Sequence, residues 1–287
     1  MKKELIQMVR CRFSRIVALL CLSMTGIAVN AQDANVGALP RGTEIQSASF
    51  LGFGGLDIQD TYLSPNLYSG QALVVASEKT TLMSQKGRRS YLDKWTKADV
   101  GMLSDKNSRG AEISFLADMM ESRMWLFYDD ARFTVLAGYN MNFLVGGVYN
   151  LRNSNNPAQA KVYVGAGLST MGIWRFQYGY VPFAVRLSID KPLLGLGFSP
   201  EYGQLYYQIY ENGLTSHNIF LSHPFNSDNV SYKLMLDIPA GNIQIRTGLE
   251  MQDYSYKVNN LKSKHFEINL VLGLVKKLEY GYNGRNR

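Results

Sequence analysis

The chain has 287 residues, of which 46% are hydrophobic, and its formal net charge at pH 7 is +7. Beyond the first 31 residues, no segment is apolar over the roughly 20 residues that a transmembrane helix needs, which excludes an α-helical membrane protein. A chain of this length suits one large β domain or two small ones.

The first residues have the pattern of a secretion signal. Five basic residues precede an apolar run at 16–22, and the small or aliphatic side chains of Val29 and Ala31 suit signal peptidase. We therefore expect residues 1–31 to be a signal peptide that is cleaved after Ala31. The alternative is an N-terminal membrane anchor, for which the apolar run is short.

Both cysteines, Cys11 and Cys21, lie in this leader, so the mature chain can form neither a disulfide framework nor a thiolate zinc site. A lipoprotein is disfavoured because Leu20, rather than a small residue, precedes Cys21. Cleavage leaves 25 basic and 22 acidic residues scattered along the chain, which give no electrostatic footprint for nucleic acid. We expect an exported protein with no nucleic-acid partner.

Alternation of apolar and polar residues between turn signals divides the mature chain into about twelve strands. In NIQIRTGLEMQ, residues 242–252, the aliphatic side chains share one parity while Arg246 and Glu250 share the other, so one face of the strand is apolar and the other is charged. The predicted strands are 43–53, 69–83, 89–103, 110–127, 132–149, 160–177, 180–196, 203–211, 215–224, 230–239, 242–258 and 263–278.

The connections between these strands alternate in length, as the tight periplasmic turns and longer extracellular loops of outer-membrane barrels do. Aromatic residues gather near both ends of the strands, for example Tyr210 near the short turns and Tyr254 near the long loops, as two membrane–water interfaces select for. We therefore expect an all-β fold, an antiparallel up-and-down transmembrane β-barrel over residues 32–280, followed by a C-terminal tail at 281–287. The long connections are 54–68, 104–109, 150–159, 197–202, the stretch around 224–226, and 259–262; the short ones are 85–88, 129–130, 179, 212–213 and 239–241.

Five stretches carry a family resemblance: TYLSPNLYSG (61–70), NLRNSNNPAQAK (150–161), PLLGLGFSPEYGQLYYQIY (192–210), LDIPAGNIQIRTG (236–248) and KVNNLK (257–262). Through them the chain resembles an uncharacterised Bacteroidetes family of predicted outer-membrane barrels, domain of unknown function 3316. The resemblance covers nearly all of the mature chain. It implies a barrel in the cell outer membrane and brings no activity with it.

The polar parity of several strands is expected to face the barrel interior. If Ile238 pairs with Ile243, Asp237 opposes Gln244 and lies diagonal to Arg246, within reach of a long side chain. Such residues could line a path for a small solute, or they could form an ion-pair network that fills the barrel. We favour the second interpretation, since only about 16–18 strands leave a wide channel. The lumen-lining candidates are Arg186, Asp190, Lys233, Asp237, Gln244, Arg246, Glu250, Glu267 and Asn269.

The long connections supply a second set of candidates. Their prolines and glycines restrict the backbone, and their aromatic and amide side chains suit recognition on a rigid scaffold. On the expected topology they lie on the cell exterior, where they either bind a partner or fold inward to cap the lumen. The extracellular-loop candidates are Tyr62, Tyr68, Arg152, Asn153, Asn156, Glu201, Tyr202 and Gln204.

No motif for catalysis or metal binding is evident in the sequence. Ser216 and His217 are adjacent, so they would point to opposite faces of a strand, and His217 and His223 would lie about 20 Å apart along it. We therefore expect no catalytic residue, metal site or cofactor.

The sequence thus indicates a non-enzymatic outer-membrane barrel that serves as a narrow pore, a recognition surface or a subunit of an envelope complex. The alternatives are a barrel-embedded lipid-modifying enzyme and a soluble exported β protein. Outer-membrane lipid is an expected partner and another envelope protein is a candidate one, while the oligomeric state is left open.

Overall fold

A computed structural model describes residues 37–39, 44–85, 88–107, 110–154, 156–240 and 243–279. The expected signal peptide, the C-terminal tail and Tyr280 lie outside these residues. No helix among the described residues has the length and apolar composition needed to cross a membrane. The strands are β1 (Glu44–Asp60), β2 (Tyr68–Gln85), β3 (Arg88–Asp105), β4 (Ala111–Asp129), β5 (Phe133–Asn150), β6 (Ala158–Tyr178), β7 (Val181–Phe198), β8 (Ile219–Ser222), β9 (Ser227–Ala240), β10 (Ile243–Val258) and β11 (Leu261–Glu279).

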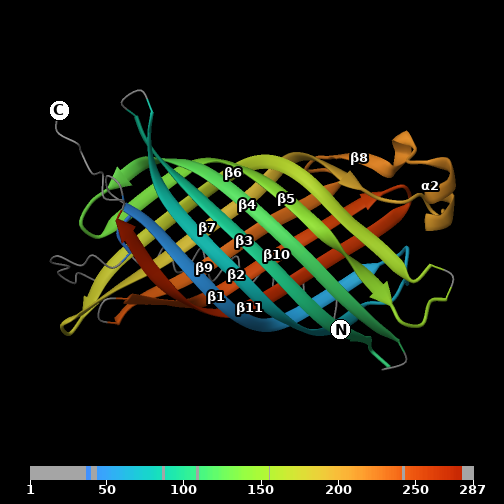
Figure 1. Ribbon diagram of the computed structural model, residues 1–287, viewed down its shortest axis with the longest axis horizontal. Coiled ribbons are helices and arrows are strands. Elements are labelled where there is room, and N and C mark those ends of the chain that lie inside the picture. The colour runs from blue at the N-terminus through green and yellow to red at the C-terminus, as the bar shows by residue number, and fades with distance from the viewer. Residues whose placement is uncertain are drawn as a thin grey trace, which may run out of the picture.

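These strands form one antiparallel sheet that closes into a barrel (Figure 1). Neighbours in sequence pair with one another from β1 to β7 and from β9 to β11, and the pairs β7–β9 and β1–β11 complete the ring. Strand β8 is additional, because it pairs only with the end of β7. The expected all-β antiparallel barrel is confirmed, with ten wall strands rather than about twelve.

The difference in strand count arises between β7 and β9. The predicted strand 203–211 is wrong, since it contains the helix α2 (Tyr206–Asn212), and the predicted strand 215–224 contains a 3₁₀ turn (Ser216–Asn218) followed by β8. Leu205, Tyr206 and Ile209 are half-buried with the spacing of a helix face. The helix begins where the Gln208 side chain accepts a hydrogen bond from the Leu205 amide (2.9 Å), and it ends at Gly213, where φ is +79°.

The two ends of the barrel differ. At one end, β2 is followed closely by β3, β4 by β5, β6 by β7 and β9 by β10, and the first residue of β1, Glu44, pairs with the last residue of β11, Glu279. The other end carries α2 and the longer connections (Figure 1). The predicted long connection 259–262 is wrong, because β10 and β11 are joined at this end by the two-residue turn 259–260. Tyr210 and the turn 212–213, which were predicted at the short-turn end, therefore lie at the long-loop end.

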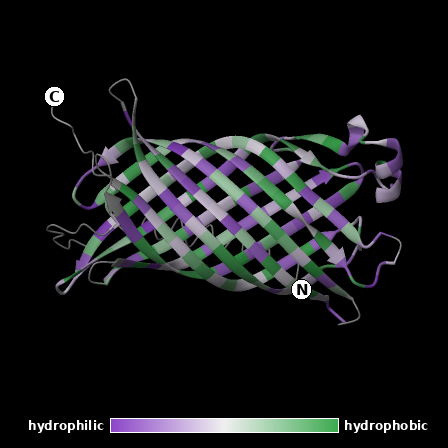
Figure 2. Cartoon of the chain, in the orientation of Figure 1, coloured by the Kyte–Doolittle hydropathy of each residue, from purple (hydrophilic) through white to green (hydrophobic). Residues whose placement is uncertain are grey.

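The wall has an apolar outer face and a charged inner face. Leu51, Leu73 and Met102 are each about two-thirds exposed on the outside, while charged residues such as Lys97 and Glu250 are buried inside. Figure 2 shows hydrophobic and hydrophilic residues alternating along the strands. A soluble protein has the reverse distribution, whereas a barrel surrounded by lipid has this one.

Tyr254 was expected near the membrane–water interface and Tyr68 in an extracellular loop, but both lie inside the barrel, as does Tyr256. Tyr68, Tyr254 and Tyr256 are buried, and Tyr68 begins β2 rather than lying in an exposed loop. The reason is parity: Tyr254 and Tyr256 share the face of β10 that carries Arg246. The placement of Tyr68 among the extracellular-loop candidates was wrong.

Candidate functional site: the charged interior and the capped end of the barrel

The lumen-lining candidates all lie on the inner face of the wall. Each is less than a tenth exposed, although every one has a polar side chain. Buried polar groups of this kind are stable only when they bond to one another. The residues placed in this way are Arg186, Asp190, Lys233, Asp237, Gln244, Arg246, Glu250, Glu267 and Asn269.

A pair of arginines surrounds Asp237. Arg246 donates to both of its carboxylate oxygens (Nε to Oδ1 2.5 Å, Nη2 to Oδ2 3.1 Å), and Arg186 Nε donates to Oδ2 at 2.8 Å. Arg246 also contacts the carboxylate of Glu78 on the far strand β2. The expected register was wrong by two residues, since Ile238 pairs with Ile245, and this tighter hairpin puts Asp237 directly opposite Arg246.

A second group joins β9 to β7. Lys233 Nζ lies 3.0 Å from Asp190 Oδ2 and 5.0 Å from the centre of the Trp95 ring. Ser122 Oγ donates to the other oxygen of Asp190 at 3.1 Å, and Ser169 also donates to it. Lys233 is therefore held by a carboxylate and an aromatic face together.

A third group centres on Lys97. Its ammonium lies 2.9 Å from Glu250 Oε1, contacts Glu267 and donates to Gln252 Oε1. Asn269 donates to the second oxygen of Glu250 at 2.8 Å. Sequence reasoning missed Lys97, yet the signal was present, because Lys97 shares one parity of its strand with two aspartates and a tryptophan.

The two ends of the interior are filled differently. Near the long-loop end, Lys161 contacts Asp60 and Ser263, and its ammonium lies 5.3 Å from the Tyr256 ring centre. Near the short-turn end, Leu39 packs in a buried apolar cluster with residues such as Leu136. In the described part of the chain, the interior thus has ionic contacts near the long-loop end and apolar contacts near the short-turn end.

The connections after β1, β5, β7 and β10 are tied together at the long-loop end, and we call them the cap. Tyr62 donates its hydroxyl to the carbonyl of Gln204 (2.8 Å), and its ring packs edge-on against Tyr206, with the ring centres 5.8 Å apart. Asn153 Nδ2 donates to the Leu63 carbonyl (3.2 Å), and Asn259 Nδ2 to the His217 carbonyl (2.8 Å). Burial, and then the charge of Asp60, raise the pKa of Tyr62 to about 12.

The other extracellular-loop candidates differ in how far they are buried in the cap. Asn153, Asn156, Glu201 and Gln204 are half-buried, whereas Arg152 and Tyr202 are exposed. Sequence reasoning missed further exposed apolar side chains at this end. Tyr207 and Tyr210 were placed on a predicted strand, and Leu214 and Phe225 lie in connections but were not chosen as candidates. Each of the four is more than half exposed.

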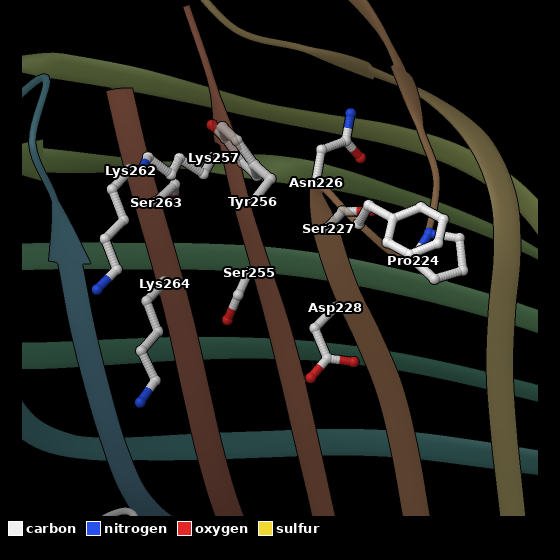
Figure 3. A pocket seen from close by; sticks show the side chains of 11 residues that line it. Pro224, Asn226, Ser227, Asp228, Ser255, Tyr256, Lys257, Lys262, Ser263 and Lys264 are labelled. Atoms are coloured by element: carbon white, nitrogen blue, oxygen red, sulfur yellow. The ribbon is translucent and has the colours of Figure 1, made fainter. Parts of the chain in front are cut away.

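A basic hollow lies beside the cap, where β9, β10 and β11 end (Figure 3). Its volume is about 330 Å³. Lys257 and Lys262 are direct cross-strand partners, and the nearby Lys264 adds a third ammonium. Like charges in this position repel, so an anionic group would be favourable there.

His217 and His223 lie in separate turns, the first exposed and the second half-buried. His217 is 74% exposed, and its Nδ1 lies 3.7 Å from Glu201 Oε1. Among the described residues, no hydroxyl group hydrogen-bonds to His217, and the adjacent Ser216 lies in the same 3₁₀ turn. His223 accepts a hydrogen bond from the Phe225 amide (3.3 Å) and lies beyond β8.

Residues 16–285 match the family model described as "Protein of unknown function (DUF3316)". The chain therefore belongs to this uncharacterised family. No protein with a curated description matches the chain.

Several solved structures resemble the chain in part. The outer membrane protease OmpT from Escherichia coli has 8% identity and a TM-score of 0.44, with 87% of this chain and 100% of that chain covered. The transport unit of the autotransporter AIDA-I, also from E. coli, has 11% identity and a TM-score of 0.43, with 85% and 92% covered. The COG4313 outer membrane channel from Pseudomonas putida F1 has 12% identity and a TM-score of 0.35, with 87% and 100% covered. At these values the likeness says nothing about what this chain binds or does.

Proposed function

We propose that this member of the DUF3316 family is a non-enzymatic outer-membrane protein whose barrel is closed to solutes and whose working surface is the cap on the cell exterior. The observation that carries the proposal is the interior itself. The charged side chains on the inner face are buried, and most of them bond to one another, some between neighbouring strands and some between distant ones. A solute path would need some of these groups to be exposed to water.

The cap supports a binding role. Its backbone is held by hydrogen bonds between separate connections, while Tyr202, Tyr207, Tyr210 and Phe225 project from it into solvent. Aromatic side chains on a rigid base lose little entropy on binding, so they favour recognition of a partner such as another envelope protein.

A permeability assay tests the closed interior. Liposomes that contain the purified protein should swell in small sugars no faster than liposomes of lipid alone. Arg246→Ala serves as the comparison, because it removes one side chain from the interior. Sugar entry through the wild-type protein that depends on solute size would contradict the proposal.

Fractionation and tagging test the location and the topology. The protein should fractionate with the outer membrane and migrate differently on gels when boiled, as closed barrels do. A tag inserted after Ser154 should bind antibody on intact cells, and a tag after Gly241 should bind only after lysis. The opposite labelling would invert the topology, and recovery of stable protein in the soluble fraction would exclude the membrane barrel.

A further inference from the structure

Three metal-ligating side chains meet inside the barrel. Asp99 on β3 and His265 and Glu267 on β11 each bring one ligand atom within 4.8 Å of the others. All three are essentially inaccessible to solvent. Strands β2 and β1 lie between β3 and β11 in the sheet, so the contact spans the curved inner face of the wall.

Two of these side chains lack the hydrogen bonds that burial normally requires. Among the described residues, neither ring nitrogen of His265 and neither carboxylate oxygen of Asp99 has a hydrogen-bond partner. Buried polar groups in folded proteins are nearly always bonded, so unbonded donors and acceptors that face one another point to a missing ligand. The Asn269 Oδ1 atom, two positions from Glu267 on the same face of β11, is also buried without a donor.

The local charge points to a cation. Lys97 is the nearest ammonium, and it contacts Glu250 and Glu267. Asp99 and Asp118 interact electrostatically with the same lysine. Lys97 thus interacts with four carboxylates. Lys233 also acts on Asp118 and Lys161 on His265, but these two lysines contact carboxylates of their own, Asp190 and Asp60. The carboxylates of the cluster therefore remain in excess, and burial of that negative charge is costly unless protons or a cation neutralise it.

We infer that Asp99, His265 and Glu267 form a binding site for a divalent transition-metal ion. One imidazole and two carboxylates suit Zn²⁺, whereas Ca²⁺ and Mg²⁺ prefer oxygen ligands alone. The ion joins β3 to β11 and neutralises the excess charge around Lys97. Because the three residues meet only in the closed barrel, metal binding stabilises the folded state. This inference is independent of the role of the cap.

Zinc binding by the full-length protein in detergent tests the inference. The protein is stripped with a chelator and titrated with Zn²⁺, and both the bound zinc and the temperature of barrel unfolding on gels are measured. We expect one zinc ion per chain and a higher unfolding temperature. His265→Gln and Asp99→Asn should weaken zinc binding at least about 100-fold, since loss of mere outer-shell partners already costs about 10–100-fold.

His217→Gln is the matched control, because it removes an exposed histidine of the cap and should leave zinc binding unchanged. If His265→Gln does not fold, zinc binding is measured on Asp99→Asn, because asparagine has almost the same shape as aspartate. Equal zinc binding by the wild type and Asp99→Asn would place the ion elsewhere and overturn the inference. Absence of zinc from the wild type, with Asp99→Asn unfolding at a higher temperature, would show that protons neutralise the cluster.

Discussion

The interior and the cap of this barrel are held by different kinds of contact. The interior depends on ion pairs that are shielded from water, such as the one between Arg246 and Asp237. The cap depends on neutral hydrogen bonds to backbone carbonyls, such as the one from Tyr62 to Gln204. A broken interior pair leaves a buried charge, whereas a broken cap bond exposes a group that water can satisfy. We therefore expect interior changes to act on the whole fold and cap changes to act locally.

The largest effect is expected for Arg246→Glu. The new carboxylate would lie beside Asp237 and Glu78, which already share the arginine. Removal of one partner of a buried pair costs about 3–5 kcal/mol, and a charge reversal should cost more. Urea unfolding in lipid vesicles measures the loss.

Lys257→Glu is the control for this prediction, because it reverses an exposed charge on the same strand and should change stability little. A several-fold change in liposome swelling by Arg246→Glu, at unchanged stability, would show that the interior conducts solute.

The next effect is expected for Lys161→Met, at the boundary between the two regions. The variant leaves Asp60 buried without its ammonium, which should cost about 3–5 kcal/mol. Asp60 also accepts the amide hydrogen of Tyr62 (3.0 Å), so the cap should become more sensitive to protease. If the barrel became less stable but the rate of protease cleavage in the cap did not change, the interior and the cap would be energetically independent even at their boundary.

A smaller effect is expected for Tyr62→Phe, which keeps the ring contact with Tyr206 and removes the hydrogen bond to Gln204. Loss of this bond should weaken the cap by about 1 kcal/mol. The raised pKa of Tyr62, about 12, gives a pH test. The neutral phenol stabilises the cap fully below a pH of about 10, which is the pKa of tyrosine in the unfolded chain. This stabilisation is lost as the pH rises toward 12 and the phenol ionises.

Protease cleavage of the cap should therefore accelerate from pH 10 to 12 in the wild type and less in Tyr62→Phe. Identical pH profiles for the two proteins would show that this hydroxyl does not hold the cap.

The smallest effect on stability is expected for Tyr207→Ala combined with Tyr210→Ala. Both side chains are mostly exposed, so the change should stay within about 0.5 kcal/mol. In purification with mild detergent, we expect the wild type to retain an envelope protein as a partner and this variant to lose it. Retention of that partner by the variant would exclude these two side chains from the binding surface.

The sequence was sufficient to place the charged candidates of β7, β9, β10 and β11 on the inner face, because parity along a strand determines the face. It did not place Tyr68, Tyr254 and Lys97 there, although all three are buried. It misassigned 203–211 because Leu205, Tyr207 and Ile209 also alternate, and the signals for a helix are only a glutamine and a glycine at its ends. The sequence could not predict which of the inward-facing charges form pairs. Lys97 and Glu250 are 153 residues apart, and only the register of the intervening strands brings them together.

The same limit applies to the cluster of Asp99, His265 and Glu267. Residues 265 and 267 share a face by parity, but alternation gives no information about the distant strand that lies opposite them. Three histidines without a recognisable metal motif were therefore read as an absence of metal ligands. A metal site assembled across a barrel has no local spacing to detect.

The pairing of β1 with β11 has a consequence for the order of assembly. The last strands supply the partners for charges on the first ones: Arg246 for Glu78, and Glu250 and Glu267 for Lys97. A chain whose synthesis or export has stopped before β10 would carry these charges without partners. Transfer of the unpaired charges from water into the barrel interior would be energetically unfavourable. Insertion into the membrane should therefore begin only when the whole chain is present. The charges that close the finished barrel would thus keep an incomplete one in the aqueous compartment.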